Sequence, residues 1–165
     1  GSFEYLNNFS FLAVLCYIIM GAIMTRGKSA RRLVDFGYSL VSVLPGGLAI
    51  AAVLACMLFG AISGSAIATL VAIGSVMLPA MRERGYPENF SVGLLTSAAE
   101  LDILVPPSIP MIILAITNDL SVGRIYLAGY LPSLLFVATY SIYCYYYAKR
   151  NRIQKGKLVS SQEIW

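Results

Sequence analysis

The stretch ILVPPSIPMIIL, residues 103–114, combines a strongly apolar composition with three prolines within five positions. A proline inside a helix removes one backbone hydrogen bond and clashes with the preceding turn. Pro106, Pro107 and Pro110 therefore predict a break in any helix that enters this stretch. The sequence interrupts its backbone where it is most apolar, and the remaining residues indicate why.

The composition predicts a membrane protein. Of the 165 residues, 58% are hydrophobic and 12% are charged, whereas soluble domains are about 45–50% apolar and about 25% charged. A globule of this size cannot bury so much apolar surface, so a bilayer is the better solvent. In lipid, a broken helix survives only where protein or a water-filled cavity surrounds it, and its exposed helix ends can bind ions and anionic groups. The proline stretch is thus a predicted binding site.

Positive charges predict the orientation of the chain. They gather in three clusters, which are Arg26, Lys28, Arg31 and Arg32, then Arg82 and Arg84, then Lys149, Arg150, Arg152, Lys155 and Lys157. Basic residues favour the cytoplasmic side of a membrane. An even number of crossings should therefore separate each cluster from the next.

Hydropathy and charge together divide the chain into six segments. We expect a transmembrane helix at 7–25, an interfacial amphipathic arm helix at 27–44, paired apolar arms at 45–82, a discontinuous transmembrane helix at 88–118, a transmembrane helix at 121–149 and a cytoplasmic tail at 150–165. The arm helix is expected because Leu33, Phe36, Leu40 and Val43 recur at helical spacing. Aromatic residues beside Lys149 mark a membrane–water boundary.

The paired arms at 45–82 allow two interpretations. Only Ser63, Gly64 and Ser65 separate the arms. They are either two full spans joined by a tight outer turn or a re-entrant hairpin whose tip stays at membrane depth. The charge pattern fits both, and the small residues at the tip also suit close helix packing.

The residues exclude several functional classes. The chain has no histidine and no P-loop pattern, so we expect neither ATP-driven chemistry nor a histidine-based metal centre. A hydrolase using Glu100 and Asp102 is disfavoured, because positions two apart on a helix point about 200° away from each other.

Several motifs occur in order along nearly the whole chain: RRLVDF, LPGGLA, ISGSAIAT, IGSVMLPAM, RGY, PPSIPMII and SVGRIYLAGYLPSLL. With them the sequence resembles the DctM-like large membrane (permease) subunit of tripartite ATP-independent periplasmic (TRAP) transporters. The resemblance implies an all-α membrane protein of the bacterial inner membrane. It implies half of an elevator-type carrier, with one re-entrant helical hairpin at 45–82 and one proline-broken transmembrane helix at 88–118. Family members carry a second, inverted half, so the chain is expected to be a partial permease.

The resemblance also implies a function and partners. It implies sodium-coupled import of a small carboxylate-type solute that a periplasmic substrate-binding protein delivers, with sodium as coupling ion and no tightly bound cofactor. The expected partners are that binding protein, a small membrane subunit, the remaining half of the large subunit and the lipid bilayer, and not nucleic acid. We expect no enzymatic activity. The alternative is a scaffold or partner subunit built from a partial permease.

The implied sites lie at the two interruptions. The resemblance assigns substrate binding to Ser63, Gly64, Ser65, Thr69, Pro106, Pro107 and Ser108. The sodium candidates are Ser63, Ser65 and Val105 from the resemblance, together with Asp102, which is added because a charge at bilayer depth needs a partner or a function.

One departure from the family pattern is prominent. Glu100 and Asp102 stand where the family pattern is small and neutral. A carboxylate at bilayer depth needs a partner or a function. Three outcomes are open for these carboxylates: cation binding, protonation, or exposure in a water-filled vestibule. We favour the cation for Asp102, and protonation or solvation for Glu100.

Overall fold

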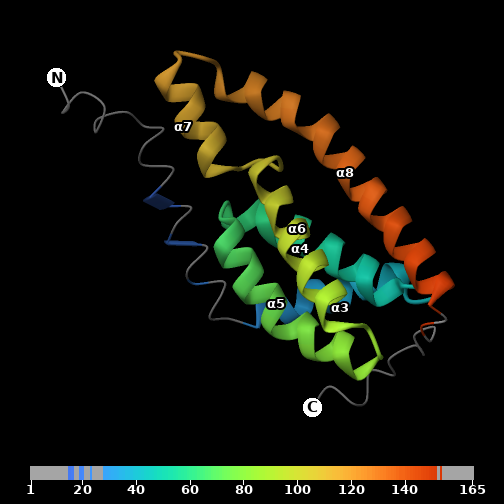
Figure 1. Cartoon of the computed structure of the whole chain (residues 1–165). Coiled ribbons are helices and arrows are strands. Elements are labelled where there is room, and N and C mark those ends of the chain that lie inside the picture. Colours follow the sequence, from blue (N-terminus) through green and yellow to red (C-terminus); the bar gives the residue numbers. More distant parts are fainter. Residues whose placement is uncertain (1–14, 17–18, 21–22, 24–27, 152, 154–165) are drawn as a thin grey trace.

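The computed structural model describes residues 15–16, 19–20, 23, 28–151 and 153, and their regular structure is helical throughout (Figure 1). The expectation of an all-α chain is thus confirmed for this part of the sequence. The predicted transmembrane helix at 7–25 and the predicted tail at 150–165 lie largely outside the described residues.

Helix α3 (Ser29–Val41) packs against the following helix with small and medium-sized side chains. Its buried residues are Ala30, Val34, Gly37 and Tyr38. Gly37 allows a close approach, since a Cβ there would lie 3.2 Å from the carbonyl oxygen of Ala51. Of the apolar stripe expected from the sequence, Phe36, Leu40 and Val43 are exposed, whereas Leu33 packs against the core. The placement of this helix at a membrane interface stays a prediction.

Helix α4 (Gly47–Ser63) is the centre of the bundle and contacts α3, α5, α6 and α8. Its mostly small or apolar residues are buried on nearly every side. Gly64 ends it in the left-handed conformation, with φ +61°, which a glycine adopts without strain. Ser65 then begins α5 (Ala66–Glu83), so the two helices form a helical hairpin.

The predicted proline break separates two short helices. Helix α6 (Glu88–Ala99) passes into the 3₁₀ turn η1 (Glu100–Ile103). Residues 104–108 follow without regular helix, and α7 (Ile109–Thr117) resumes with Pro110 in its first turn, where a proline is tolerated.

Helix α8 (Val122–Arg150) has 29 residues and runs along the outside of the other helices (Figure 1). At 1.5 Å per residue it is about 43 Å long. By length and composition, α5 and α8 are both able to cross a membrane, with mean hydropathies of 1.4 and 1.5. Much of the surface of α8 is apolar and exposed, including Leu127, Leu131 and Leu135, as lipid contact would require.

The turn between α5 and α6 is fixed to α3. Arg84 donates a hydrogen bond from Nη1 to the hydroxyl of Tyr38 at 2.6 Å, and its guanidinium lies 5.0 Å from the centre of that ring. Tyr86 is buried in the same turn, and this burial raises the pKa of Tyr86 to about 12. The hairpin base and the amphipathic helix therefore form one packed unit.

Candidate functional site

The tip of the α4–α5 hairpin is a closed polar cluster. Ser63 and Thr69 are both buried, and their hydroxyl oxygens lie 3.0 Å apart in a hydrogen bond. The backbone N–H of Ser65 also donates to the Ser63 hydroxyl at 3.4 Å. Ser65 itself is half-buried and caps α5, accepting from the N–H of Ala68 at 3.4 Å. The tip residues are held mainly by one another.

Gly64 brings this tip into contact with the proline break. A Cβ built on Gly64 would lie 3.1 Å from the carbonyl oxygen of Pro107 and 3.4 Å from Cγ1 of Ile109. The two interruptions of the chain, which are more than forty residues apart in sequence, thus touch each other. Ser108 is buried at this level, whereas Pro106 and Pro107 are half-buried.

One helical turn before Gly64, Gly60 provides the seat for Asp102. A Cβ at Gly60 would lie 2.9 Å from Cβ of Asp102 and 3.0 Å from its Oδ1. No L-residue with a side chain fits there while Asp102 keeps its place. Gly60 is not among the site residues expected from the sequence. The only local signal for it is the run of small residues before the tip, which helix packing also explains.

Asp102 is the most unusual residue of the site. Its side chain is 1% exposed, and neither carboxylate oxygen has a hydrogen-bond partner among the described residues. The hydroxyl of Ser108, 0% exposed, lacks a partner in the same sense. Glu100, two positions earlier in the same 3₁₀ turn, is exposed. A buried, unpaired carboxylate is costly unless a counter-charge or a ligand accompanies it.

The surroundings of Asp102 restrict the group that could neutralise it. The only ion pair within the described part of the chain joins Arg82 to Glu88 at the hairpin base. No cluster of three or more histidine, cysteine, aspartate or glutamate side chains occurs in that part either. With 1% exposure, the carboxylate has no room beside it for a bulky solute in this arrangement. A proton or a small cation is compatible with these limits.

Val105 was the remaining sodium candidate, and the structure places it between Asp102 and the prolines. It is buried, and its N–H donates to the carbonyl of Leu101 at 3.1 Å. Its own carbonyl belongs to the non-helical segment, so it is a candidate backbone ligand as the sequence analysis expects.

Comparison with known proteins places this architecture. The family described as "Tripartite ATP-independent periplasmic transporter, DctM component" matches residues 2–165. The chain belongs to the DctM family. The resemblance noted from the sequence motifs is therefore confirmed.

Individual relatives agree with the family match. The chain is 42% identical over 161 residues to the C4-dicarboxylate TRAP transporter large permease protein DctM of Pseudomonas aeruginosa, covering 98% of this chain and 38% of the relative. It is 42% identical to the ectoine TRAP transporter large permease protein TeaC of Halomonas elongata, covering 84% and 33%. It is 36% identical to the isethionate TRAP transporter permease protein DctMQ of Oleidesulfovibrio alaskensis, covering 91% and 24%.

These matches define what the chain shares with its relatives. The relatives are permeases, that is transporters and not enzymes, as expected from the sequence. The chain spans less than two fifths of the length of the relatives described above. Their names include C4-dicarboxylate, ectoine and isethionate, so DctM membership leaves the solute open.

Proposed function

We propose that this chain forms the core of one half of the permease subunit of a sodium-coupled TRAP transporter in a bacterial inner membrane. The solute is a small carboxylate-type molecule, delivered by a periplasmic substrate-binding protein. A small membrane subunit and the second half of the permease complete the assembly. DctM membership and the apposed chain interruptions support this proposal.

The single observation that carries the proposal is the contact between the hairpin tip and the proline break. Helix ends and unwound carbonyls at membrane depth are suited to binding ions and anionic groups, provided that protein surrounds them. The close approach of Gly64 to Pro107 supports such an arrangement, because it packs protein against the non-helical segment. We propose the substrate-site residues expected from the sequence, of which Ser63, Thr69 and Ser108 are buried.

Sodium is the proposed coupling ion, and Asp102 is its proposed charged ligand. The unpartnered carboxylate supplies a hard anionic oxygen, the donor type that hard cations take. Ser63, Ser65 and the carbonyl of Val105 are the remaining proposed ligands. The hydroxyl of Ser108 also lacks a partner.

The tip of the hairpin is proposed to lie at membrane depth. This proposal is tested with single cysteines at positions 63–65 in a background that lacks Cys16, Cys56 and Cys144. A membrane-impermeant thiol reagent added from outside should label them slowly, and sodium or solute should change the rate. Rapid labelling at a rate that neither sodium nor solute changes would support two full spans joined by an external turn.

The transport function is tested by uptake into proteoliposomes with an imposed sodium gradient. The complete transporter should accumulate solute only with sodium, whereas this 165-residue chain alone should match empty vesicles, because the site of such carriers forms between two repeats. Asp102→Asn should raise the half-saturating sodium concentration by about tenfold, which corresponds to roughly 1.4 kcal/mol of binding energy. Glu100→Gln is the matched control and should leave it within about twofold, roughly 0.4 kcal/mol.

The same assay separates the alternatives. Solute uptake that does not depend on sodium would contradict sodium as the coupling ion, but it would still support a transport function. A complete assembly that binds its partners yet moves no solute would favour the non-transporting scaffold.

A further inference from the structure

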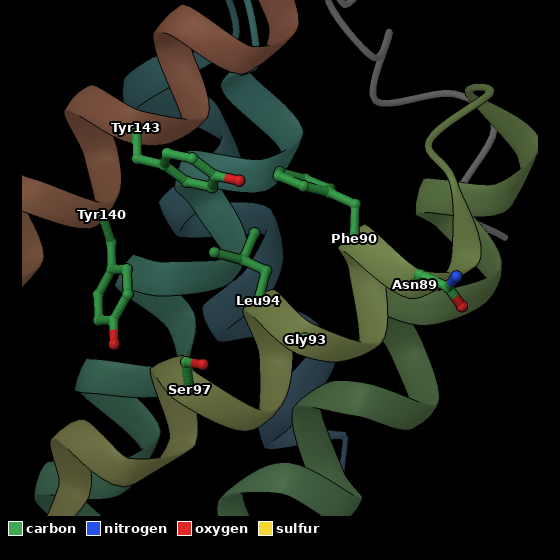
Figure 2. A pocket seen from close by; sticks show the side chains of 7 residues that line it. All are labelled: Asn89, Phe90, Gly93, Leu94, Ser97, Tyr140 and Tyr143. Carbon is green, nitrogen blue, oxygen red and sulfur yellow. The ribbon is translucent and has the colours of Figure 1, made fainter.

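Two adjoining hollows lie along the C-terminal half of α8, and α6 lines the first of them. The first, of about 260 Å³, is lined by Asn89, Phe90, Gly93, Leu94, Ser97, Tyr140 and Tyr143 (Figure 2). The second, of about 450 Å³, is lined by Tyr143, Tyr146, Tyr147, Arg150 and Asn151. Tyr143 is a wall of both. We call the two hollows together the α6–α8 groove.

Aromatic rings give the α6–α8 groove a firm wall. Phe90 stacks on Tyr147 with ring centres 3.9 Å apart, and Tyr143 lies 6.0 Å from both of these rings. Figure 2 shows Tyr143 and Phe90 directed into the space above Leu94 from opposite sides. The side chain of Leu94 is buried and forms an apolar floor. An apolar chain would meet rings and aliphatic surface along this hollow.

The end of the α6–α8 groove is basic. Arg150 lines the second hollow, and Lys149 stands beside it, with both side chains exposed. Within the described residues neither one has an acidic partner, because the sole ion pair there is at the hairpin base. Tyrosines next to unpaired basic residues at the end of a long apolar helix are typical of the membrane–water boundary. Unpaired basic residues at this depth attract anionic lipid headgroups.

The dimensions of the α6–α8 groove match one lipid leaflet. Tyr140, Tyr143, Tyr147 and Arg150 follow one another at three- and four-residue spacing, so they share one face of α8. From Tyr140 to Arg150 the helix rises about 15 Å. Half of a hydrocarbon core about 30 Å thick has the same depth. The basic end therefore lies about where a headgroup would be, and the aromatic hollow lies about where its acyl chain would begin.

We propose that the α6–α8 groove binds an anionic glycerophospholipid from the cytoplasmic leaflet. Its phosphate pairs with Arg150 and Lys149, and one acyl chain lies between Phe90, Leu94 and Tyr143. This site is separate from the contact of the hairpin tip with the proline break. The proposal does not depend on which solute the protein moves. The bound lipid fills a hollow that the described helices leave open.

The proposal is tested by quenching of tryptophan fluorescence with brominated lipids. The full chain carries Trp165→Phe to remove its natural tryptophan and Tyr143→Trp as the probe. It is reconstituted into phosphatidylcholine vesicles with a small, equal fraction of either brominated phosphatidylglycerol or brominated phosphatidylcholine. We expect the phosphatidylglycerol to quench at least about twice as strongly, since cationic side chains enrich anionic lipid around them. Tyr140→Trp, at the second ring of the first hollow, repeats the measurement independently.

Two matched variants locate the effect. Leu131→Trp lies on the same helix, 75% exposed and away from the groove, and should be quenched equally by both lipids. Lys149→Gln with Arg150→Gln should remove the excess quenching at Tyr143→Trp while leaving quenching by brominated phosphatidylcholine unchanged. Equal quenching by the two lipids at both groove positions would overturn the proposal. Absence of quenching at both would also overturn it, because protein and not lipid would then cover the groove.

Discussion

The two halves of the candidate site treat their polar groups in opposite ways. At the hairpin tip, Ser63 and Thr69 are buried and hydrogen-bonded to each other. At the proline break, Asp102 and Ser108 are equally buried, yet their side-chain oxygens have no partner among the described residues. The tip is thus complete as a piece of protein structure, whereas the break retains acceptors that a ligand could use.

This contrast matters because buried polar groups are nearly always satisfied. The exceptions in a native structure indicate a functional role, an ordered water or a bound ion. The hydroxyl pair at the tip therefore stabilises the fold in addition to any role in the proposed site, whereas the unpaired oxygens at the break contribute no hydrogen bond to the fold.

The largest effect should come from Asp102→Asn on stabilisation by sodium. A ligand present at 100 times its dissociation constant stabilises the folded state by about 2.7 kcal/mol. If Asp102 holds the ion, the wild-type assembly should gain this stability as sodium replaces choline at constant ionic strength, and the variant should gain little. Thermal or denaturant unfolding in detergent measures the difference.

The variant should also behave distinctively without sodium. Removing an unpaired buried charge relieves its desolvation cost, so Asp102→Asn should be at least as stable as wild type in choline. Glu100→Gln, at an exposed position, should leave the stability unchanged in choline and in sodium. An unaltered sodium response in Asp102→Asn would contradict the division between tip and break.

Gly60→Ala should give the next largest effect. The new Cβ would meet Cβ of Asp102 at 2.9 Å and its Cα at 3.1 Å, so the carboxylate must move. Overpacking of this kind typically costs about 1–3 kcal/mol, and sodium binding should weaken as well. Denaturant unfolding and the sodium titration measure both effects.

A matched glycine serves as the control for this variant. Gly74→Ala lies inside α5, where the nearest neighbouring atom is Cδ1 of Leu70 at 3.9 Å. Alanine should stabilise that helix by about 0.5–1 kcal/mol. Combining Gly60→Ala with Asp102→Gly should recover part of the lost stability but none of the sodium response. Equal changes of stability and sodium binding in the two single glycine variants would show that the contact of Gly60 with Asp102 is not what matters.

Ser63→Ala and Ser108→Ala compare the two halves directly. Ser63→Ala leaves the buried Thr69 hydroxyl without its partner and should cost about 1–3 kcal/mol. Ser108→Ala removes a hydroxyl that has no partner, so in the absence of sodium it should be neutral or stabilising. Unfolding measured in choline and in sodium separates the variants. A Ser63→Ala, Thr69→Val double variant should be less destabilised than Ser63→Ala, because no hydroxyl is then left unpaired.

Local chemistry explains which parts of the fold could be predicted from the sequence. Proline removes a helix donor wherever it stands, so the interruption at 106–110 follows from three residues alone. A glycine between two serines at the end of an apolar run similarly indicates a turn. The all-α class follows from composition and period, and the family from motifs that keep their order.

Tertiary contacts determine the parts that could not be predicted. Which of Glu100 and Asp102 is buried depends on Gly60, forty-two positions before Asp102, and no local pattern links the two. The period of α3 identifies its most apolar stripe, yet the protein-facing side uses the smaller residues Ala30 and Gly37. The bond from Arg84 to Tyr38 likewise joins residues 46 positions apart.

The smallest effect should come from a carboxylate that, unlike Asp102, has both a partner and water. Glu88 pairs with Arg82 at the base of the hairpin, with both side chains 56% exposed. The hydrogen bond and charge of Arg82 lower the pKa of Glu88 below its usual value. A carboxylate with a lowered folded-state pKa contributes stability above its unfolded pKa, and that contribution is lost as the pH falls through the folded pKa.

Because solvent and salt screen this exposed pair, Glu88→Gln should destabilise only slightly at neutral pH. The difference from wild type should vanish in acid and in high salt, as urea unfolding at neutral and acidic pH would measure. A loss at neutral pH as large as that of Ser63→Ala would mean that burial does not separate the important polar groups from the unimportant ones.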